Sequence, residues 1–251
     1  PIKSSAASDV YKRQAMTTNR VTGVLTGVLI TALIQSSSAT TVMVVSFVNA
    51  GLLTLTQSIG VIMGANIGTT VTAWLISALG FKVDIAAFSL PLLAFGIPLL
   101  FSGKSSRKSV GEFIFGFSFL FMGLQALKAN APDLGANPEM LAFVQNYADM
   151  GFFSIILFLF IGAILTMIVQ ASAATMAITL IMCANGWIDY QLGVALVLGE
   201  NIGTTITANL AALTGNTQAR RAALAHLAFN IFGVIWVLIL SLIHISEPTR
   251  H

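Results

Sequence analysis

A long internal repeat constrains this sequence more than any other feature. Residues 24–80 align with residues 159–215 at a constant offset of 135, without a gap. The best-matched blocks are polar or rich in glycine: Gln35–Thr40 (QSSSAT) with Gln170–Thr175 (QASAAT), and Gly64–Thr70 (GANIGTT) with Gly199–Thr205 (GENIGTT). The apolar residues between these blocks drift. A polar pattern kept in two copies is typical of a membrane chain built from two equivalent halves.

The composition identifies the bilayer as the solvent. Hydrophobic residues make up 56% of the chain and charged residues 8%, whereas soluble domains carry about 25% charge. The net charge of +3 is small and its basic residues lie in short loops, so no nucleic-acid binding is expected. Cys183 is the only cysteine, which excludes a disulfide within the chain. Four apolar runs have lengths typical of membrane helices: Ile85–Phe101, Val110–Leu127, Phe152–Val169 and Leu224–Leu242.

Both ends of the sequence look foreign to the rest. The first 14 residues are polar and patternless, and SLIHISEPTRH interrupts an apolar helix; both resemble translated sequencing-adapter segments. We expect five regions: a non-native segment at 1–14, the first repeat with its spanning helices at 15–128, an external linker at 129–150, the second repeat with the last helix at 151–240, and a non-native segment at 241–251.

The helix lengths predict a re-entrant hairpin in each half. The arms Val21–Ile34 and Ala39–Val48 are too short to cross a hydrocarbon core of about 30 Å, and the polar QSSS turn joins them. The next segment, Gln57–Leu79, is long enough, but we expect Gly64, Asn66 and Gly68 to interrupt it. The second half repeats this pattern with Ala173–Ala184 and Leu192–Leu213.

The predicted fold class is an all-α polytopic membrane protein with two inverted repeats. Each repeat is a re-entrant helical hairpin followed by a discontinuous transmembrane helix. Three crossings between the hairpins place them on opposite sides of the membrane. The positive-inside rule makes one side cytoplasmic, the side that carries Arg20, Lys104, Arg107, Lys108, Arg220 and Arg221.

Unwound backbone at membrane depth survives only where protein, water or a ligand satisfies its polar groups. Four such breaks, two hairpin tips and two NIGTT segments, would offer helix N-termini for an anion and oxygen atoms for sodium. We expect Gln35 and Gln170 to face one central cavity. The predicted substrate-binding residues are Gln35, Ser36, Ser37, Ser38, Thr40, Gln170, Ser172, Thr175, Asn66, Thr69, Thr70, Asn201, Thr204 and Thr205. Sodium is expected near Gln35, Ser37, Asn66, Thr69, Gln170, Ser172, Glu200, Asn201 and Thr204.

Three other polar residues carry separate expectations. Glu200 replaces Ala65 of the first repeat, and an intramembrane carboxylate is a functional candidate by default. It would neutralise a cation, take up a proton or hold the unwound backbone. His226 and Asn230 lie one turn apart on the last helix, and we expect them to brace a neighbouring helix and not to bind substrate.

At these motifs the chain resembles the type II sodium–phosphate cotransporter family. The likeness rests on QSSSATT, GANIGTT, QASAAT, GENIGTT and the segment Ala219–His226, and it covers essentially all of Thr17–Leu240. It implies sodium-coupled symport of inorganic phosphate across the cytoplasmic membrane by a multi-pass protein, with sodium as coupling ion and no cofactor. One departure is that the second tract reads QASAA, which leaves fewer hydroxyls in that half.

Other functions stay open from sequence. The same helix N-termini would hold another oxyanion, and the direction of flux is not specified, so a phosphate exporter is an alternative. An intramembrane hydrolase using Ser37 or Ser172 needs a nearby base, and no GxSxG motif is present. A non-transporting membrane sensor would leave the duplicated polar blocks unexplained. The oligomeric state, with a homodimer as one option, is also open.

Overall fold

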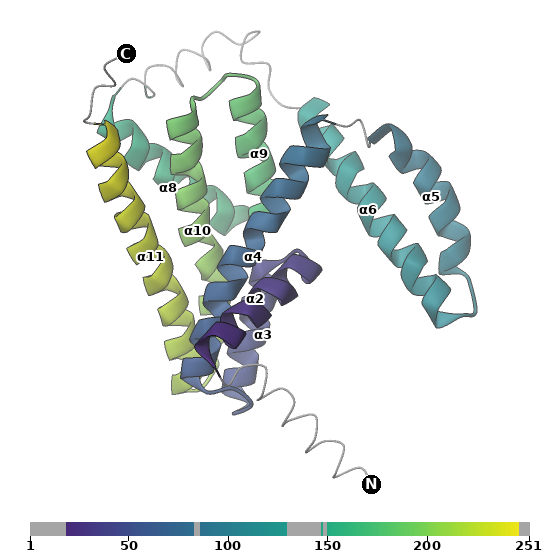
Figure 1. Cartoon of the computed structure of the whole chain (residues 1–251), viewed down its shortest axis with the longest axis horizontal. Helices are drawn as coiled ribbons and strands as arrows, with labels where there is room; N and C mark the ends of the chain where they lie inside the picture. Colours follow the sequence, from purple (N-terminus) through teal and green to yellow (C-terminus); the bar gives the residue numbers. More distant parts are fainter. Residues whose placement is uncertain (1–18, 83–85, 130–146, 148–149, 246–251) are drawn as a thin grey trace.

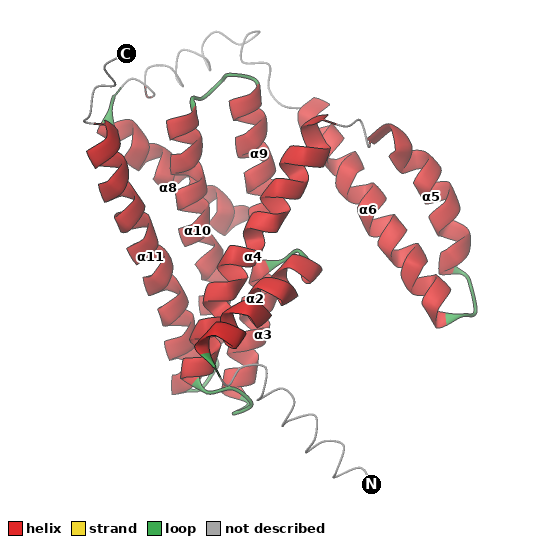
Figure 2. Cartoon of the chain, viewed as in Figure 1, coloured by secondary structure: helices red, strands yellow, loops and turns green. Residues whose placement is uncertain are grey.

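The computed structural model describes residues 19–82, 86–129, 147 and 150–245, and this part of the chain is helical without strands (Figure 2). The all-α prediction is therefore confirmed there. Most of the expected linker and of the two adapter-like ends lies outside the described residues. The helices are α2 Arg20–Ile34, α3 Ser37–Asn49, α4 Leu55–Lys82, α5 Ala86–Leu100, α6 Ser105–Ala129, α8 Phe152–Val169, α9 Ser172–Ala184, α10 Tyr190–Ala212 and α11 Thr217–Ile245.

Two helical hairpins, α2–α3 and α8–α9, match each other in detail. The second arms α3 and α9 begin and end at positions 135 apart. Each is followed by a glycine with a positive φ, Gly51 at 72° and Gly186 at 69°, a conformation that glycine adopts without strain. Figure 1 shows both tips near the middle of the molecule, with α3 and α9 running from there toward opposite ends.

The helices after the hairpins are continuous, and the predicted breaks at NIGTT are wrong. Helix α4 runs through Gly64 and Gly68 and α10 runs through Gly199 and Gly203 (Figure 1). Their glycines allow close packing instead. A Cβ atom at Gly64 would overlap the carbonyl oxygen of Val24 in α2.

The second half has the same close packing of helices at a glycine. A Cβ atom at Gly199 would overlap the carbonyl oxygen of Leu159 in α8. Facing glycines complete the contact at equivalent positions, Gly27 of α2 against α4 and Gly162 of α8 against α10. Small residues let membrane helices approach backbone to backbone, so α2 is fixed to α4 and α8 to α10.

The two halves share one interior. Helix α3 packs on α10 of the other half. Val44 and Val45 of α3 belong to a buried cluster with Ala208 of α10 and Ala222 of α11. At the end of this contact, Asn49 Oδ1 accepts a hydrogen bond from the backbone N–H of Asn216, at 2.7 Å. This buried cluster is therefore complete only when the two halves are packed together.

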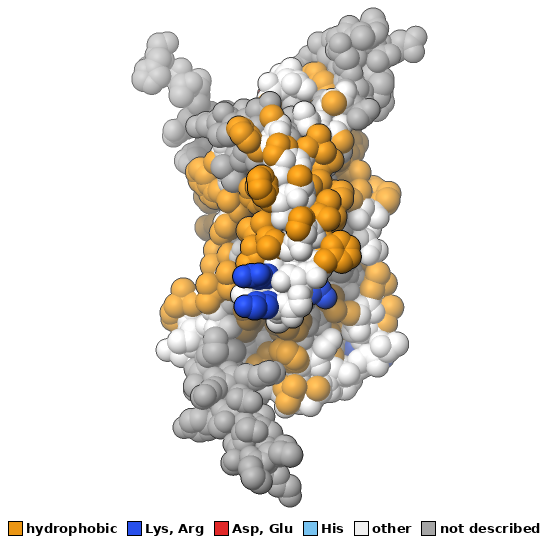
Figure 3. Space-filling model, turned by 90° about the vertical axis from the view of Figure 1, so that its right-hand side faces the viewer, with side chains coloured by type: hydrophobic (Ala, Val, Ile, Leu, Met, Phe, Trp, Pro, Cys, Tyr) orange, Lys and Arg blue, Asp and Glu red, His pale blue; other side chains and the backbone are white. Residues whose placement is uncertain are grey.

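The α5–α6 hairpin lies beside the other helices (Figure 1), and Phe121 of α6 packs against Ile76 of α4 and Ile181 of α9. Its outer surface is largely apolar: Figure 3 shows hydrophobic side chains over most of one face, with Lys and Arg gathered in a small area. Such a surface suits lipid and not water.

Among the described helices, three are long and apolar enough to cross a membrane, and they include residues Leu55–Ala78, Phe152–Val169 and Thr217–Leu240. Helix α5 has 15 residues, a length of about 22 Å, so this length does not support the prediction that Ile85–Phe101 crosses the membrane. In Figure 1 the start of α2, the α5–α6 turn and the start of α11 all lie in the lower half of the view. These segments carry the basic residues predicted to share one side.

Candidate functional site

The two hairpin tips have the same backbone conformation. Gln35 has φ 57° and Gln170 has φ 54°, both in the left-handed region that few residues other than glycine adopt. Each glutamine ends its helix by donating its backbone N–H to a threonine carbonyl oxygen, at 2.7 Å to Thr31 and 2.8 Å to Thr166. A new helix then begins at the second residue after each glutamine. Each tip thus presents the N-terminus of a helix, which favours an anion.

The first tip holds most of its polar groups in hydrogen bonds. Ser36 Oγ accepts from the Ala39 N–H at 3.2 Å and caps α3. Gln35 Oε1 accepts from Thr72 Oγ1 of α4 at 2.9 Å. Ser37 is buried, at 4% exposure, and its hydroxyl makes no hydrogen bond to the part of the chain that the structure describes.

Two threonine hydroxyl groups join α2 to α3 next to this tip. Thr31 Oγ1 of α2 donates to Thr40 Oγ1 of α3 at 3.0 Å, and Thr40 Oγ1 donates to the Ser36 carbonyl oxygen at 3.0 Å. Ser38 uses its carbonyl oxygen to accept from Thr41 Oγ1. Thr40 is thus part of the frame that holds the two arms together.

The second tip is less tightly bonded. Ala171 provides no side-chain cap for α9, and the Gln170 side chain is exposed. Thr175 Oγ1 donates to the Ala171 carbonyl oxygen at 3.3 Å. The buried Thr166 Oγ1 has no partner among the described residues, although the equivalent Thr31 has one. Ser172 is half-buried at the start of α9.

The threonines of the NIGTT segments bond to their own helices. Thr69 Oγ1 donates to the Ala65 carbonyl oxygen at 3.1 Å and Thr204 Oγ1 to that of Glu200 at 2.7 Å. Thr70 and Thr205 donate in the same way to carbonyl oxygens three residues earlier. These bonds are typical of threonines in membrane helices. The structure therefore provides two helix N-termini, at the tips, and not the four predicted.

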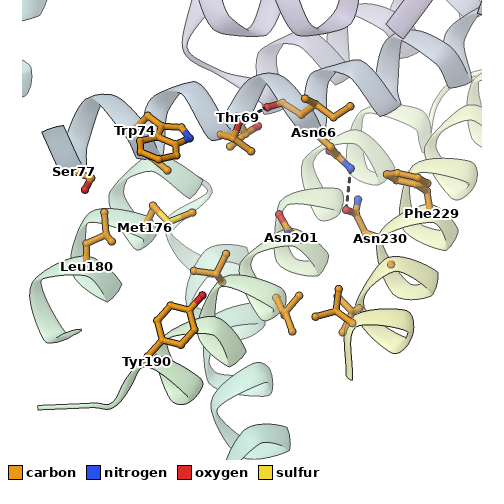
Figure 4. Close-up of a pocket in the computed structure, with 18 residues that line it drawn as sticks. Asn66, Thr69, Trp74, Ser77, Met176, Leu180, Tyr190, Asn201, Phe229 and Asn230 are labelled. Atoms are coloured by element: carbon orange, nitrogen blue, oxygen red, sulfur yellow. Dashed lines mark hydrogen bonds between the residues drawn. The ribbon is translucent and has the colours of Figure 1, made fainter. Parts of the chain in front are cut away.

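A cavity of about 760 Å³ lies between α4, α9, α10 and α11 (Figure 4). Four predicted site residues line it, namely Asn66, Thr69, Thr70 and Asn201. Its wall is otherwise largely apolar and includes Trp74, Met176, Tyr190 and Phe229, which Figure 4 shows around the space. The residues of the hairpin tips do not line it, so this cavity is not the one that Gln35 and Gln170 were predicted to share.

Asn66 connects α4 to α11. Its Nδ2 donates to Asn230 Oδ1 at 2.9 Å (Figure 4), and its Oδ1 accepts from His226 Nε2 at 3.2 Å. Asn230 Nδ2 in turn donates to the His226 carbonyl oxygen. The prediction that His226 and Asn230 brace a neighbouring helix is confirmed. The Asn66 amide is occupied by this brace, which weakens its case as a ligand for substrate or sodium.

Asn230→Ala is expected to lower the free energy of unfolding by about 1 kcal/mol, because it leaves the Asn66 Nδ2 without its acceptor. Thermal unfolding in detergent measures this loss. Ser46→Ala is the matched control, since that exposed hydroxyl bonds only to the Val42 carbonyl oxygen of its own helix. Equal unfolding temperatures for the two variants would contradict the brace.

Glu200 is buried, at 2% exposure, and its Oε1 accepts from Thr179 Oγ1 of α9 at 2.8 Å. Of the three roles considered for Glu200, holding unwound backbone is excluded, because α10 is continuous there. Sequence reasoning missed Thr179, Thr31 and Thr166. For the last two the signal was present, since both precede the tip glutamine by four residues.

A comparison with known proteins matches both halves of the chain. A family model described as "Na+/Pi-cotransporter" matches residues 5–129 and 142–247. "Uncharacterized protein YqeW" of Bacillus subtilis is 32% identical over 94% of this chain and 74% of its own length. "Putative inorganic phosphate export protein YjbB" of Escherichia coli is 31% identical over 89% of this chain.

A shorter segment is similar to an animal protein. "Sodium-dependent phosphate transport protein 2A" of Ovis aries is 45% identical over 73 residues, which are 29% of this chain and 11% of that protein. The chain also spans only 39% of the length of the Escherichia coli relative. No solved structure matches.

Proposed function

This chain belongs to the Na+/Pi-cotransporter family, and we propose that it carries inorganic phosphate across the cytoplasmic membrane by symport with sodium. The family is one of transporters, so the intramembrane hydrolase considered from sequence is set aside. A secondary active mechanism, in which the sodium gradient drives phosphate, is the simplest one for a chain with the duplicated architecture described above.

One observation carries the proposal: two matched hairpin tips, each with a left-handed glutamine and a helix that begins at a buried or half-buried serine. Free N–H groups of a helix N-terminus bind phosphate without a basic side chain. We assign the phosphate seat to the tips, with Ser37 and Ser172 as direct ligands. Both hairpins are then re-entrant, and the two halves are inverted repeats, which agrees with the opposite directions of α3 and α9 in Figure 1.

The remaining predicted residues divide by their contacts. Gln35, Ser36 and Thr40 shape the first tip, while Gln170 and Thr175 do so in the second. Asn201, Thr69 and Thr70 line the cavity between α4 and α10, where we propose that they contact water or ions. Thr204 and Thr205 are buried and bonded within α10, so we propose for them a structural role beside any site.

A phosphate exporter is the second candidate, and the name of the Escherichia coli relative favours it. The two candidates share one site and differ in the gradient that drives flux. Symport requires uptake to follow an inward sodium gradient. Export requires phosphate to leave along its own gradient or against it with another ion.

Radiolabelled phosphate uptake into proteoliposomes tests the proposal. We expect uptake to rise several-fold with an inward sodium gradient and to stay at the level of empty liposomes when choline replaces sodium. Excess unlabelled sulfate should leave uptake unchanged, because the family match is to phosphate carriers. Equal flux in sodium and choline would remove sodium coupling, and full competition by sulfate would indicate a general oxyanion carrier.

A further inference from the structure

The carboxyl group of Glu200 is a buried polar group next to the second hairpin that is only half satisfied. One oxygen, Oε1, accepts from Thr179 Oγ1 at 2.8 Å. The other, Oε2, is fully buried and has no hydrogen-bond partner among the described residues. A buried carboxylate that lacks partners is costly unless a positive charge neutralises it. The structure therefore leaves one oxygen and one negative charge to be compensated.

Among the described residues, no side chain near Glu200 supplies that charge. Helices α3, α8 and α9, which pack on α10, contain no charged residue. In α11, Arg220 and Arg221 lie in the first turn, where Arg220 donates to the Leu213 carbonyl oxygen, and His226 is bonded to Asn66. Within the described residues, the one ion pair joins Lys108 and Glu112 on the surface of α6. The carboxylate must then be neutralised by a bound cation or by a proton.

The first half shows that the fold does not need this group. Glu200 corresponds to Ala65, and Thr179 corresponds to Val44, at the same offset of 135. Ala65 and Val44 are both buried, at 0% and 4% exposure. An apolar pair thus fills in the first half the place that a carboxylate and a hydroxyl occupy in the second. Both members of the pair differ together, which indicates a function beyond packing.

Glu200 and Thr179 lie some distance from the tip of the second hairpin, where the phosphate seat is proposed. Ser172, Thr175 and Thr179 are spaced along one face of α9, and Thr179 is about 10 Å further along the helix than Ser172. A carboxylate next to the phosphate seat would repel the anion in a low dielectric. At this depth it is separated from the anion but still connected to the tip by a row of hydroxyl groups.

We propose that Glu200 and Thr179 form a sodium-binding site that exists only in the second half, with Glu200 Oε2 and the Thr179 hydroxyl oxygen as ligands. Oxygen ligands suit a hard cation. A monovalent ion neutralises the single carboxylate, whereas a divalent ion would leave one buried positive charge uncompensated. The site deepens the proposed function, since it assigns one coupling ion to one half of the transporter.

Sodium binding without phosphate tests this site directly. Purified protein in detergent is heated in increasing NaCl, with choline chloride keeping the ionic strength constant. The wild-type unfolding temperature is expected to rise with sodium. Glu200→Gln keeps an acceptor for Thr179 but removes the charge, so the sodium-dependent rise should disappear. Glu112→Gln makes the same change in an exposed carboxylate and should keep the rise.

The double variant Glu200→Ala/Thr179→Val guards against misfolding, because it rebuilds the apolar pair already present in the first half. It should fold, lose sodium stabilisation and, in proteoliposomes, move one sodium fewer per phosphate. A sodium response retained by Glu200→Gln and by the double variant would overturn the site. Stabilisation of the wild type by acid and not by sodium would also overturn it, in favour of a proton.

Failure of the sodium site can be distinguished from failure of the proposed transport function. A wild-type protein that binds sodium through Glu200 but carries no phosphate would refute the proposed transport and leave the site intact. Sodium-driven phosphate flux that is unchanged in stoichiometry by both variants would do the reverse.

Discussion

Gly199→Ala is expected to lower the free energy of unfolding by about 3 kcal/mol or more, a loss at the upper end for overpacking. The added Cβ would overlap the Leu159 carbonyl oxygen in the α8 backbone, which cannot rotate away as a side chain would. Gly64→Ala should behave alike, since its Cβ would overlap the Val24 carbonyl oxygen. Thermal unfolding in detergent and the yield of monodisperse protein measure both.

Gly116→Ala in α6 is the matched control, because among the described residues no atom beyond its chain neighbours and its own helix backbone lies within 4 Å of its Cβ position. That change should be neutral or stabilise the helix by up to about 1 kcal/mol. The comparison also decides between two roles of the GxNIGTT glycines. If they marked breaks in α4 and α10, alanine would be tolerated at Gly199 about as well as at Gly116, and that result would contradict the packing described here.

Ser37→Ala and Ser172→Ala are each expected to lower the apparent affinity for phosphate roughly tenfold or more, because a buried hydrogen bond to a charged partner contributes about 1.5–3 kcal/mol. If the two tips contribute independently, the double variant loses about a hundredfold. The measurement is phosphate uptake against phosphate concentration in proteoliposomes at matched protein amounts.

Ser36→Ala is the control at the neighbouring position. Ser36 caps α3, so its loss should cost about 1 kcal/mol of stability and leave transport per folded molecule close to wild type. The second tip already has Ala171 at this position. Three serine variants with equal transport would show that these hydroxyls do not contact the substrate.

The hairpins could be predicted from sequence because their signals are local. Gln35 and Gln170 each follow a short apolar arm and precede small hydroxylated residues, and the observed arms α2 and α3 differ from the predicted ones by one or two residues at their ends. Helix length, turn position and the repeat all predicted a helical hairpin at each of these positions. Such agreement between levels makes a prediction dependable.

The continuity of α4 and α10 could not be predicted in the same way. A glycine in an apolar helix fits either a break or a close approach of another backbone, and only the neighbouring helix decides between them. The partner of Glu200 was hidden for the same reason. Thr179 is separated from it by 21 positions, and nothing in the α9 sequence indicates which of its faces meets α10.

The hydrogen bond between Asn49 and Asn216 joins positions 167 residues apart, and the α3–α10 contact beside it is equally distant in the sequence. At a synthesis rate of about 5–20 residues per second, roughly 10–30 s separate these segments on the ribosome. During that time α3 is already made, but the helix against which it packs is not. The first hairpin is therefore an incomplete unit in the membrane during that time. In a chain that stops after α6, Val44 and Val45 lack their partners from α10 and α11.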